Sequence, residues 1–92
     1  MLSLFRTRYT VQLTHINREY ELEIRENNEI IQLSLLYGTN IMYDFYYFLT
    51  KQNFTLIQTE DTITLELYGS KQYNNFIEKL KLFEKNYKIL IF

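Results

Sequence analysis

The chain has 92 residues, of which 47 % are hydrophobic and 17 % aromatic, and this composition excludes an intrinsically disordered protein. Its formal net charge is −1, and the absence of cysteine excludes disulfides and thiolate metal sites. No segment reaches the roughly 20 apolar residues of a membrane-spanning helix. We therefore expect one domain over residues 1–92, with no membrane span.

The first third of the chain alternates apolar and polar side chains, which indicates three antiparallel strands. Two-residue turns at 17–18 and 27–28 connect them, and asparagine suits the positive φ that tight hairpins need. The first hairpin then pairs Val11 with Ile24, Leu13 with Leu22, and His15 with Tyr20. The second pairs Ile24 with Ile31, Leu22 with Leu33, and Tyr20 with Leu35. Apolar residues meet apolar residues, with His15 the one mild exception, and this agreement predicts the register.

A helix and another hairpin follow the third strand. Gly38 permits the turn, and Thr39 or Asn40 is the expected cap of a helix that runs to about Gln52. Two further strands then form a hairpin across residues 60–61, in which the apolar side chains again share one face.

The second helix is predicted over residues 71–85, with Ser70 as its N-cap. Its apolar residues form one stripe at helical spacing, made of Tyr73, Phe76, Ile77, Leu80 and Phe83. Residues 87–92 close the chain as a last strand. The element order βββαββαβ predicts an α+β fold, a mostly antiparallel sheet with two helices on one face.

The last six of these elements, βαββαβ, resemble the ferredoxin-like two-layer sandwich in their order. In that fold the first strand of the unit pairs with another strand on each side. Here the N-terminal hairpin is also expected to pair with one edge of that strand. Two arrangements follow from this conflict. Either the strand order of the sheet differs from the ferredoxin-like one, or the N-terminal hairpin is partly detached.

The segment 43–49, YDFYYFL, places aromatic rings on both sides of the first helix. Successive residues turn by 100°, so one face carries Ile41, Met42, Phe45, Phe48 and Leu49. The opposite face carries Tyr43, Tyr46, Tyr47 and Thr50. Only the first face is needed for the core. The second is either a solvated face, a face covered by residues 1–5 or by the C-terminal segment, or a stripe that binds a protein partner.

The chain offers little for catalysis or for cofactor binding. His15 is the only histidine, and general acid–base chemistry and metal binding both need partners that the sequence does not place beside it. Three of the five glutamates of residues 19–29 alternate along an outer strand face, which is typical of solvated charge. No phosphate-binding glycine motif is present. We expect a protein that is not an enzyme, with no cofactor and no metal site.

Nucleic acid is the alternative partner. Residues 1–70 hold five basic and nine acidic side chains, whereas residues 71–92 hold five basic and two acidic ones. The basic rim consists of Lys71, Lys79, Lys81, Lys85 and Lys88. One feature argues against RNA binding. The expected open face of the sheet is polar and acidic and has no aromatic side chains that could stack on bases. Its predicted residues are Thr10, Gln12, Thr14, Glu21, Glu23, Arg25, Gln32, Ser34, Thr64 and Glu66.

The composition also bears on the source. Alanine and proline, whose codons are rich in G and C, are absent, and the abundant Phe, Tyr, Ile, Asn, Leu and Lys have codons rich in A and T. This bias indicates an AT-rich genome. The opening residues 1–13 lead directly into strand-like alternation, so no signal peptide is expected. We expect an intracellular protein, and an organelle, a bacterial cytoplasm and a virus-infected host cell all fit.

The leading functional hypothesis is a small non-catalytic protein-binding module, a subunit or accessory factor that docks on a larger complex. The stripe Tyr43/Tyr46/Tyr47/Thr50 would make the contact. An RNA- or ribosome-associated protein that uses the lysine rim is the alternative, and a phage or viral inhibitor of a host protein is third. Self-association of the chain is left open.

Overall fold

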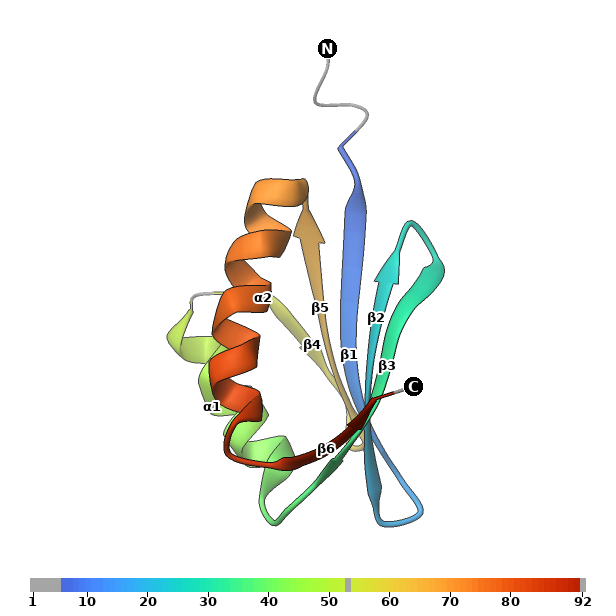
Figure 1. Cartoon of the computed structure of the whole chain (residues 1–92), viewed down its shortest axis with the longest axis vertical. Coiled ribbons are helices and arrows are strands. Elements are labelled where there is room, and N and C mark those ends of the chain that lie inside the picture. The colour runs from blue at the N-terminus through green and yellow to red at the C-terminus, as the bar shows by residue number, and fades with distance from the viewer. Residues whose placement is uncertain (1–5, 53, 92) are drawn as a thin grey trace.

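The structure, a computed structural model, describes residues 6–52 and 54–91 of the chain (Figure 1). Six strands and two helices follow one another as β1 (Arg8–Ile16), β2 (Glu19–Glu26), β3 (Glu29–Tyr37), α1 (Ile41–Lys51), β4 (Leu56–Gln58), β5 (Thr62–Tyr68), α2 (Ser70–Glu84) and β6 (Lys88–Ile91). The predicted α+β class and the element order βββαββαβ are confirmed.

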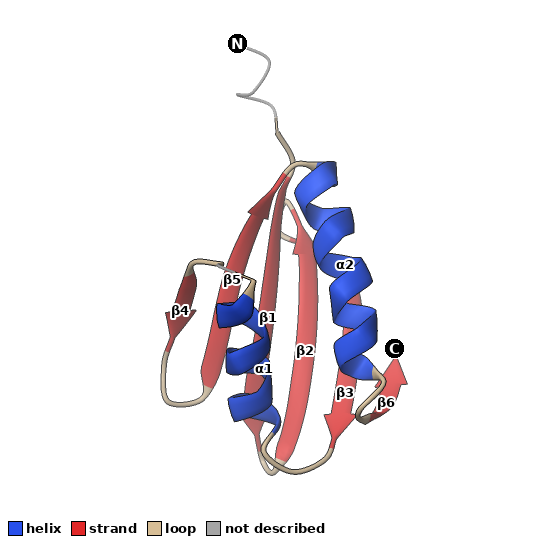
Figure 2. Ribbon diagram, turned by 90° about the vertical axis from the view of Figure 1, so that its left-hand side faces the viewer, coloured by secondary structure: helices blue, strands red, loops and turns tan. Residues whose placement is uncertain are grey.

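All strands belong to one antiparallel sheet with the order β4-β5-β1-β2-β3-β6, and both helices lie on the same face of it (Figure 2). The last four strands, β3 to β6, keep the relative order of a ferredoxin-like sheet, with β6 beside β3 and β4 beside β5. The N-terminal hairpin β1–β2 is inserted between β3 and β5, at the centre of the sheet. A partly detached hairpin is therefore wrong, and a different strand order is correct.

The first hairpin has the register that the sequence predicts. Val11 lies opposite Ile24, and Leu13 lies opposite Leu22. Both residues of its turn have positive φ, 50° at Asn17 and 69° at Arg18. This turn geometry matches the right-handed twist of the two strands. The side chains that face the helices from β1 and β2 are therefore placed by local sequence alone.

The second hairpin differs from the predicted register by one residue. Leu22 lies opposite Ser34, where the sequence predicted Leu33, and Ile24 lies opposite Gln32. Arg25 still pairs with Ile30, so Ile31 is the extra residue of a β-bulge.

Because side chains alternate along a strand, the bulge exchanges the two faces of β3 beyond it. Ser34 and Leu36 face the helices and are 0 % and 1 % exposed. The predicted placement of Gln32 and Ser34 on the open face is wrong, since Leu33 and Leu35 lie there instead. Leucine occurs in both alternate sets of β3, but the set that faces the helices also holds Gln32 and Ser34, so the apolar pattern of this strand favours the other register.

The two helices share one aromatic-rich core with the sheet. Phe48 of α1 stacks on Phe83 of α2 with 5.1 Å between ring centroids, and Phe54 meets Phe76 edge-on at 5.6 Å. The predicted stripe of α2 is confirmed. Phe76, Leu80 and Phe83 are buried, and the other two members pack against them.

Tyr87 connects the ends of the two helical segments. Its ring lies 5.0 Å from that of Phe83, and its hydroxyl donates a hydrogen bond to the carboxylate of Asp44 in α1. A Cβ at Gly38 would lie 2.8 Å from Cδ1 of Tyr87. Gly38 does not have positive φ, so glycine is needed here because an aromatic ring packs against its backbone. Gly69 is different, because its φ of 85° is one that glycine adopts most readily, and Gly69 is the N-cap of α2 in place of the predicted Ser70.

This contact predicts a coupled effect of two substitutions. Gly38→Ala should lower the free energy of unfolding by about 1–3 kcal/mol, because the added methyl group overlaps the ring of Tyr87. In a Tyr87→Ala background the same change should cost much less, since the ring is gone. Urea denaturation of the four proteins of this double-mutant cycle measures the coupling. Equal costs in both backgrounds would contradict the packing role of Gly38.

Candidate functional site

Helix α1 has a fully buried face and an exposed aromatic face. Ile41, Phe45 and Leu49 are 0 % exposed and anchor the helix on the sheet. The opposite face carries the tyrosine stripe, which we define as Tyr43, Tyr46, Tyr47 and Thr50. Exposure of its three rings is 70 %, 41 % and 52 % in chain order.

The C-terminal strand does not cover this stripe. β6 pairs with β3 at the edge of the sheet, so it adds a strand instead of folding over α1 (Figure 1). Cover by residues 1–5 was the other predicted possibility, and it falls outside the described residues. The stripe is thus an open surface of the described part of the chain.

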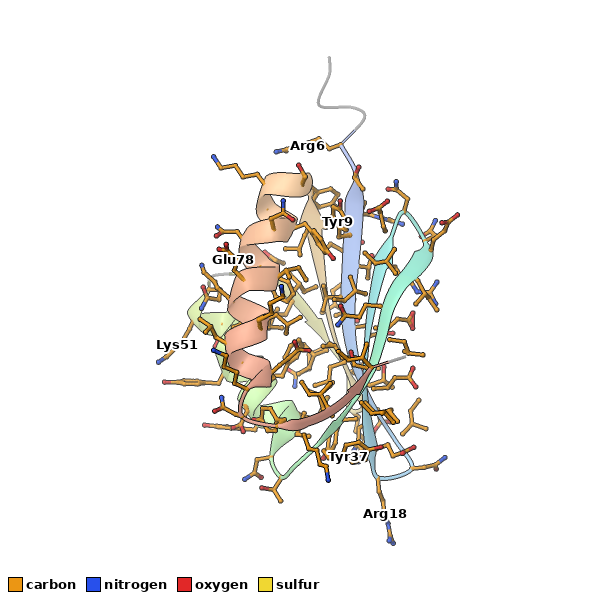
Figure 3. The ribbon with its side chains drawn as sticks, in the orientation of Figure 1. Arg6, Tyr9, Arg18, Tyr37, Lys51 and Glu78 are labelled. Carbon is orange, nitrogen blue, oxygen red and sulfur yellow. The ribbon has the colours of Figure 1, made fainter. Side chains whose placement is uncertain are left out.

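Local contacts hold the C-terminal half of the stripe. The hydroxyl of Thr50 donates a hydrogen bond to the carbonyl oxygen of Tyr47, at 3.0 Å. Lys51 points outward from α1 (Figure 3), and its Nζ lies 4.6 Å from the ring centroid of Tyr47. The ring of Tyr47 is therefore already oriented for an interaction with a cation.

An open pocket of about 270 Å³ lies beside the stripe, between α1 and the connection from α2 to β6. Its lining consists of Asp44, Tyr47, Phe48, Phe83, Asn86 and Tyr87. Burial and the hydrogen bond to Asp44 raise the pKa of Tyr87 far above its ordinary value of 10.0, so this phenol stays protonated as the donor. No local sequence pattern indicates this pocket, because its walls come from segments about forty positions apart in the chain.

The lysine rim is not a single surface. Lys71 lies in the first turn of α2, whereas Lys85 follows its last turn. Lys88 lies on β6 opposite Tyr37, on the sheet face that the helices leave open. Among the described residues, none of the five lysines forms a salt bridge. The fold therefore spreads these charges over both layers.

Most of the open sheet face is polar, as predicted. Arg25 forms a salt bridge with Glu23, and Arg8 approaches Glu66 at 3.7 Å. His15 lies on the other face, in the same alternate set as Leu13, where it is exposed and stacks on Tyr20 with 4.4 Å between ring centroids. Within residues 6–52 and 54–91, no group of three or more acidic, histidine or cysteine side chains could hold a metal ion.

One part of the open face is apolar, contrary to the polar face that the sequence predicts. The bulge turns Leu33, Leu35 and Tyr37 of β3 outward, where Leu90 of β6 lies opposite Leu35. Tyr37 and Leu90 line an open depression of about 540 Å³ there, with Lys88 at its border. The sequence carries these apolar residues as the alternate set Ile31, Leu33, Leu35 and Tyr37, but its pattern places that set in the core. This outer apolar patch is a second surface that could contact a partner.

Comparisons with protein-family models, with curated proteins and with solved structures found no match to this chain. No helix of the described segments combines the length and apolar character that crossing a membrane requires. Surface geometry and chemistry are therefore the grounds on which a function can be argued.

Glu84, on α2, has a buried carboxyl oxygen, Oε2, without a hydrogen-bond partner among the described residues. Burial raises the pKa of this carboxyl above its ordinary value of 4.5, and the nearby charge of Lys81 lowers it in part. A raised pKa means that the folded state binds the proton more tightly than the unfolded state does. The free energy of unfolding should therefore fall as the pH rises from 4.5 to the pKa of the folded state.

Glu84→Gln removes this titration. The stability of the variant relative to the wild type should increase as the pH rises through that window and stay constant above it. Denaturation midpoints measured between pH 3 and pH 8 test this, with Glu78→Gln as a matched control (on the exposed side of the same helix, Figure 3). Parallel pH profiles for wild type and Glu84→Gln would contradict the assignment.

Proposed function

We propose that this protein is a non-catalytic protein-binding module, a subunit or accessory factor of a larger assembly, and that its tyrosine stripe makes the contact. One observation carries the proposal. The helix that buries Ile41, Phe45 and Leu49 completely also holds three tyrosine rings in solvent. The core does not need those rings, so they are available to a second molecule.

The chemistry of the stripe suits a protein surface. Tyrosine is enriched in interfaces because its ring contributes a large apolar area while its hydroxyl can hydrogen-bond at the rim. The stripe also lies on a regular helix that is fixed by its buried face. A pre-organised surface loses little conformational entropy when a partner binds. Three rings at helical spacing therefore provide several anchors without ordering a flexible segment.

Binding of RNA through the lysine rim has less support. The lysines are divided between α2 and the open sheet face, and Glu78 lies among those of the helix. The open face does carry Tyr37 on β3 and Tyr68 on β5, but these strands are not neighbours. β2, one of the two strands between them, carries Glu21 and Glu23. Acidic side chains at the centre of a sheet disfavour phosphate groups. We therefore keep the protein-binding proposal.

The test removes the rings and keeps the fold. Replacing Tyr43, Tyr46 and Tyr47 together by serine should leave stability nearly unchanged, since exposed positions contribute little to folding. Affinity capture with the wild type identifies the partner, and calorimetry with the purified partner measures the dissociation constant. We expect the triple variant to bind about 30-fold more weakly or worse, because truncation of an interface hot spot costs roughly 2 kcal/mol or more.

A matched control removes apolar surface elsewhere. Ile57 and Leu82 are 64 % and 62 % exposed, on β4 and on the solvent side of α2. The double variant Ile57→Ser/Leu82→Ser should bind the partner as the wild type does. An unchanged affinity of the tyrosine variant, or an equal loss in the control, would refute the role of the stripe.

A further inference from the structure

The pocket beside the tyrosine stripe combines aromatic walls with a carboxylate. Phe83 stands between Phe48 and Tyr87, with centroid distances of 5.1 Å and 5.0 Å, and Tyr47 brings one ring of the stripe into the lining. Asp44 places its carboxylate among these rings. A partner that covers the stripe would therefore lie over this pocket as well.

The carboxylate of Asp44 is oriented but not neutralised. Its Oδ2 accepts the hydrogen bond from the hydroxyl of Tyr87, which restrains the orientation of the group. In the part of the chain that the structure describes, no lysine, arginine or histidine forms a salt bridge with Asp44. A negative charge held beside aromatic faces is complementary to a cation, since both the carboxylate and the ring quadrupoles attract it.

We infer that this pocket binds the guanidinium group of an arginine side chain from the protein partner. The inference rests on the proposed function and names the chemistry of its partner. Arginine fits better than lysine because its planar group stacks on aromatic rings and donates hydrogen bonds to a carboxylate in a fixed geometry. The volume of about 270 Å³ suits a single side chain, as it is below the range of roughly 300–1,000 Å³ for pockets that hold a whole drug-sized ligand.

The contact between Lys51 and Tyr47 supports this chemistry. The ammonium group of Lys51 lies 4.6 Å from the centroid of the Tyr47 ring, within the distance of about 6 Å that defines a cation–π interaction. The ring thus attracts a cation even on the solvent-exposed helix. Within the pocket the carboxylate of Asp44 adds its charge to this attraction.

The experiment uses the full chain and a small probe, Nα-acetyl-arginine amide, followed by ¹H–¹⁵N NMR. We expect saturable shifts with a dissociation constant on the order of 1 mM, localised to the amides of Asp44, Tyr47, Phe48, Asn86 and Tyr87. The matched probe is Nα-acetyl-citrulline amide, which has nearly the same shape without the charge. It should produce no saturable shifts at these amides.

Two variants separate a specific site from general attraction. Asp44→Asn keeps an oxygen that can accept the hydrogen bond from Tyr87 and should weaken arginine binding about fivefold or more. Tyr47→Leu, at an exposed position, should also weaken arginine binding. This variant replaces Asp44→Asn as the test if Asp44→Asn does not fold. Glu78→Gln removes the same charge from the solvent side of α2 and should leave binding unchanged.

The inference is overturned if citrulline binds as well as arginine, if saturation is absent, or if Glu78→Gln weakens binding as much as Asp44→Asn. Its failure differs from failure of the proposed function. If the triple tyrosine-to-serine variant loses the partner but the wild type does not bind arginine, the stripe is the contact and the pocket is not an arginine site. If the wild type binds arginine but the triple tyrosine-to-serine variant binds the partner with unchanged affinity, the stripe is not the contact.

Discussion

Helices cover only one face of this sheet, and every other feature of the structure depends on that asymmetry. Each strand has two alternate sets of side chains, and only one set can be buried beneath α1 and α2. The β-bulge at Ile31 is the point where this constraint acts on β3. By adding one residue, it brings Leu36 under the helices and places Ser34, which bonds to Gln32, in the buried set. The cost is that Leu33 and Leu35 move to the open face.

The same constraint explains why apolar surface is left over in two places. The core has room for one face of α1, so the tyrosines on its other face are exposed. The core also has room for one set of β3, so leucines and Tyr37 form the outer apolar patch beside β6. These two surfaces lie on opposite sides of the sheet. A protein that docked through the stripe could therefore still present the patch to another molecule or to a second copy of itself.

Tyr87 links the core to the proposed binding surface. Its ring packs on Gly38 and Phe83, which fixes the connection between α2 and β6 against the start of α1. Its hydroxyl orients the carboxylate of Asp44 at the wall of the pocket. The residue that closes one end of the fold thus also sets the chemistry beside the stripe. Stability and recognition should be coupled at this position, whereas the exposed rings of Tyr43 and Tyr46 can be changed with little effect on folding.

Features that depend on neighbouring residues could be predicted from the sequence, whereas features that depend on distant segments could not. Helical spacing is local, so the two faces of α1 and the buried stripe of α2 could be derived from the residues alone. The first hairpin could be derived too, because its turn and its alternating pattern agree on one register. The exposure of the stripe could not, since it depends on where β6 and other distant segments lie.

The strand order, the bulge and the pocket beside the tyrosine stripe were decided by tertiary structure. The hairpin β1–β2 lies between β3 and β5 because its two outer edges pair with those strands. Alternation along a single strand does not indicate which other strand it will pair with. The register of β3 could not be derived from its pattern, because apolar alternation favours Leu33 and Leu35 inward, whereas the bulge turns the set with Gln32 and Ser34 inward. The pocket needed Asp44 and Tyr87 to meet across more than forty positions of chain, and only the close packing of the two helical segments brings them together.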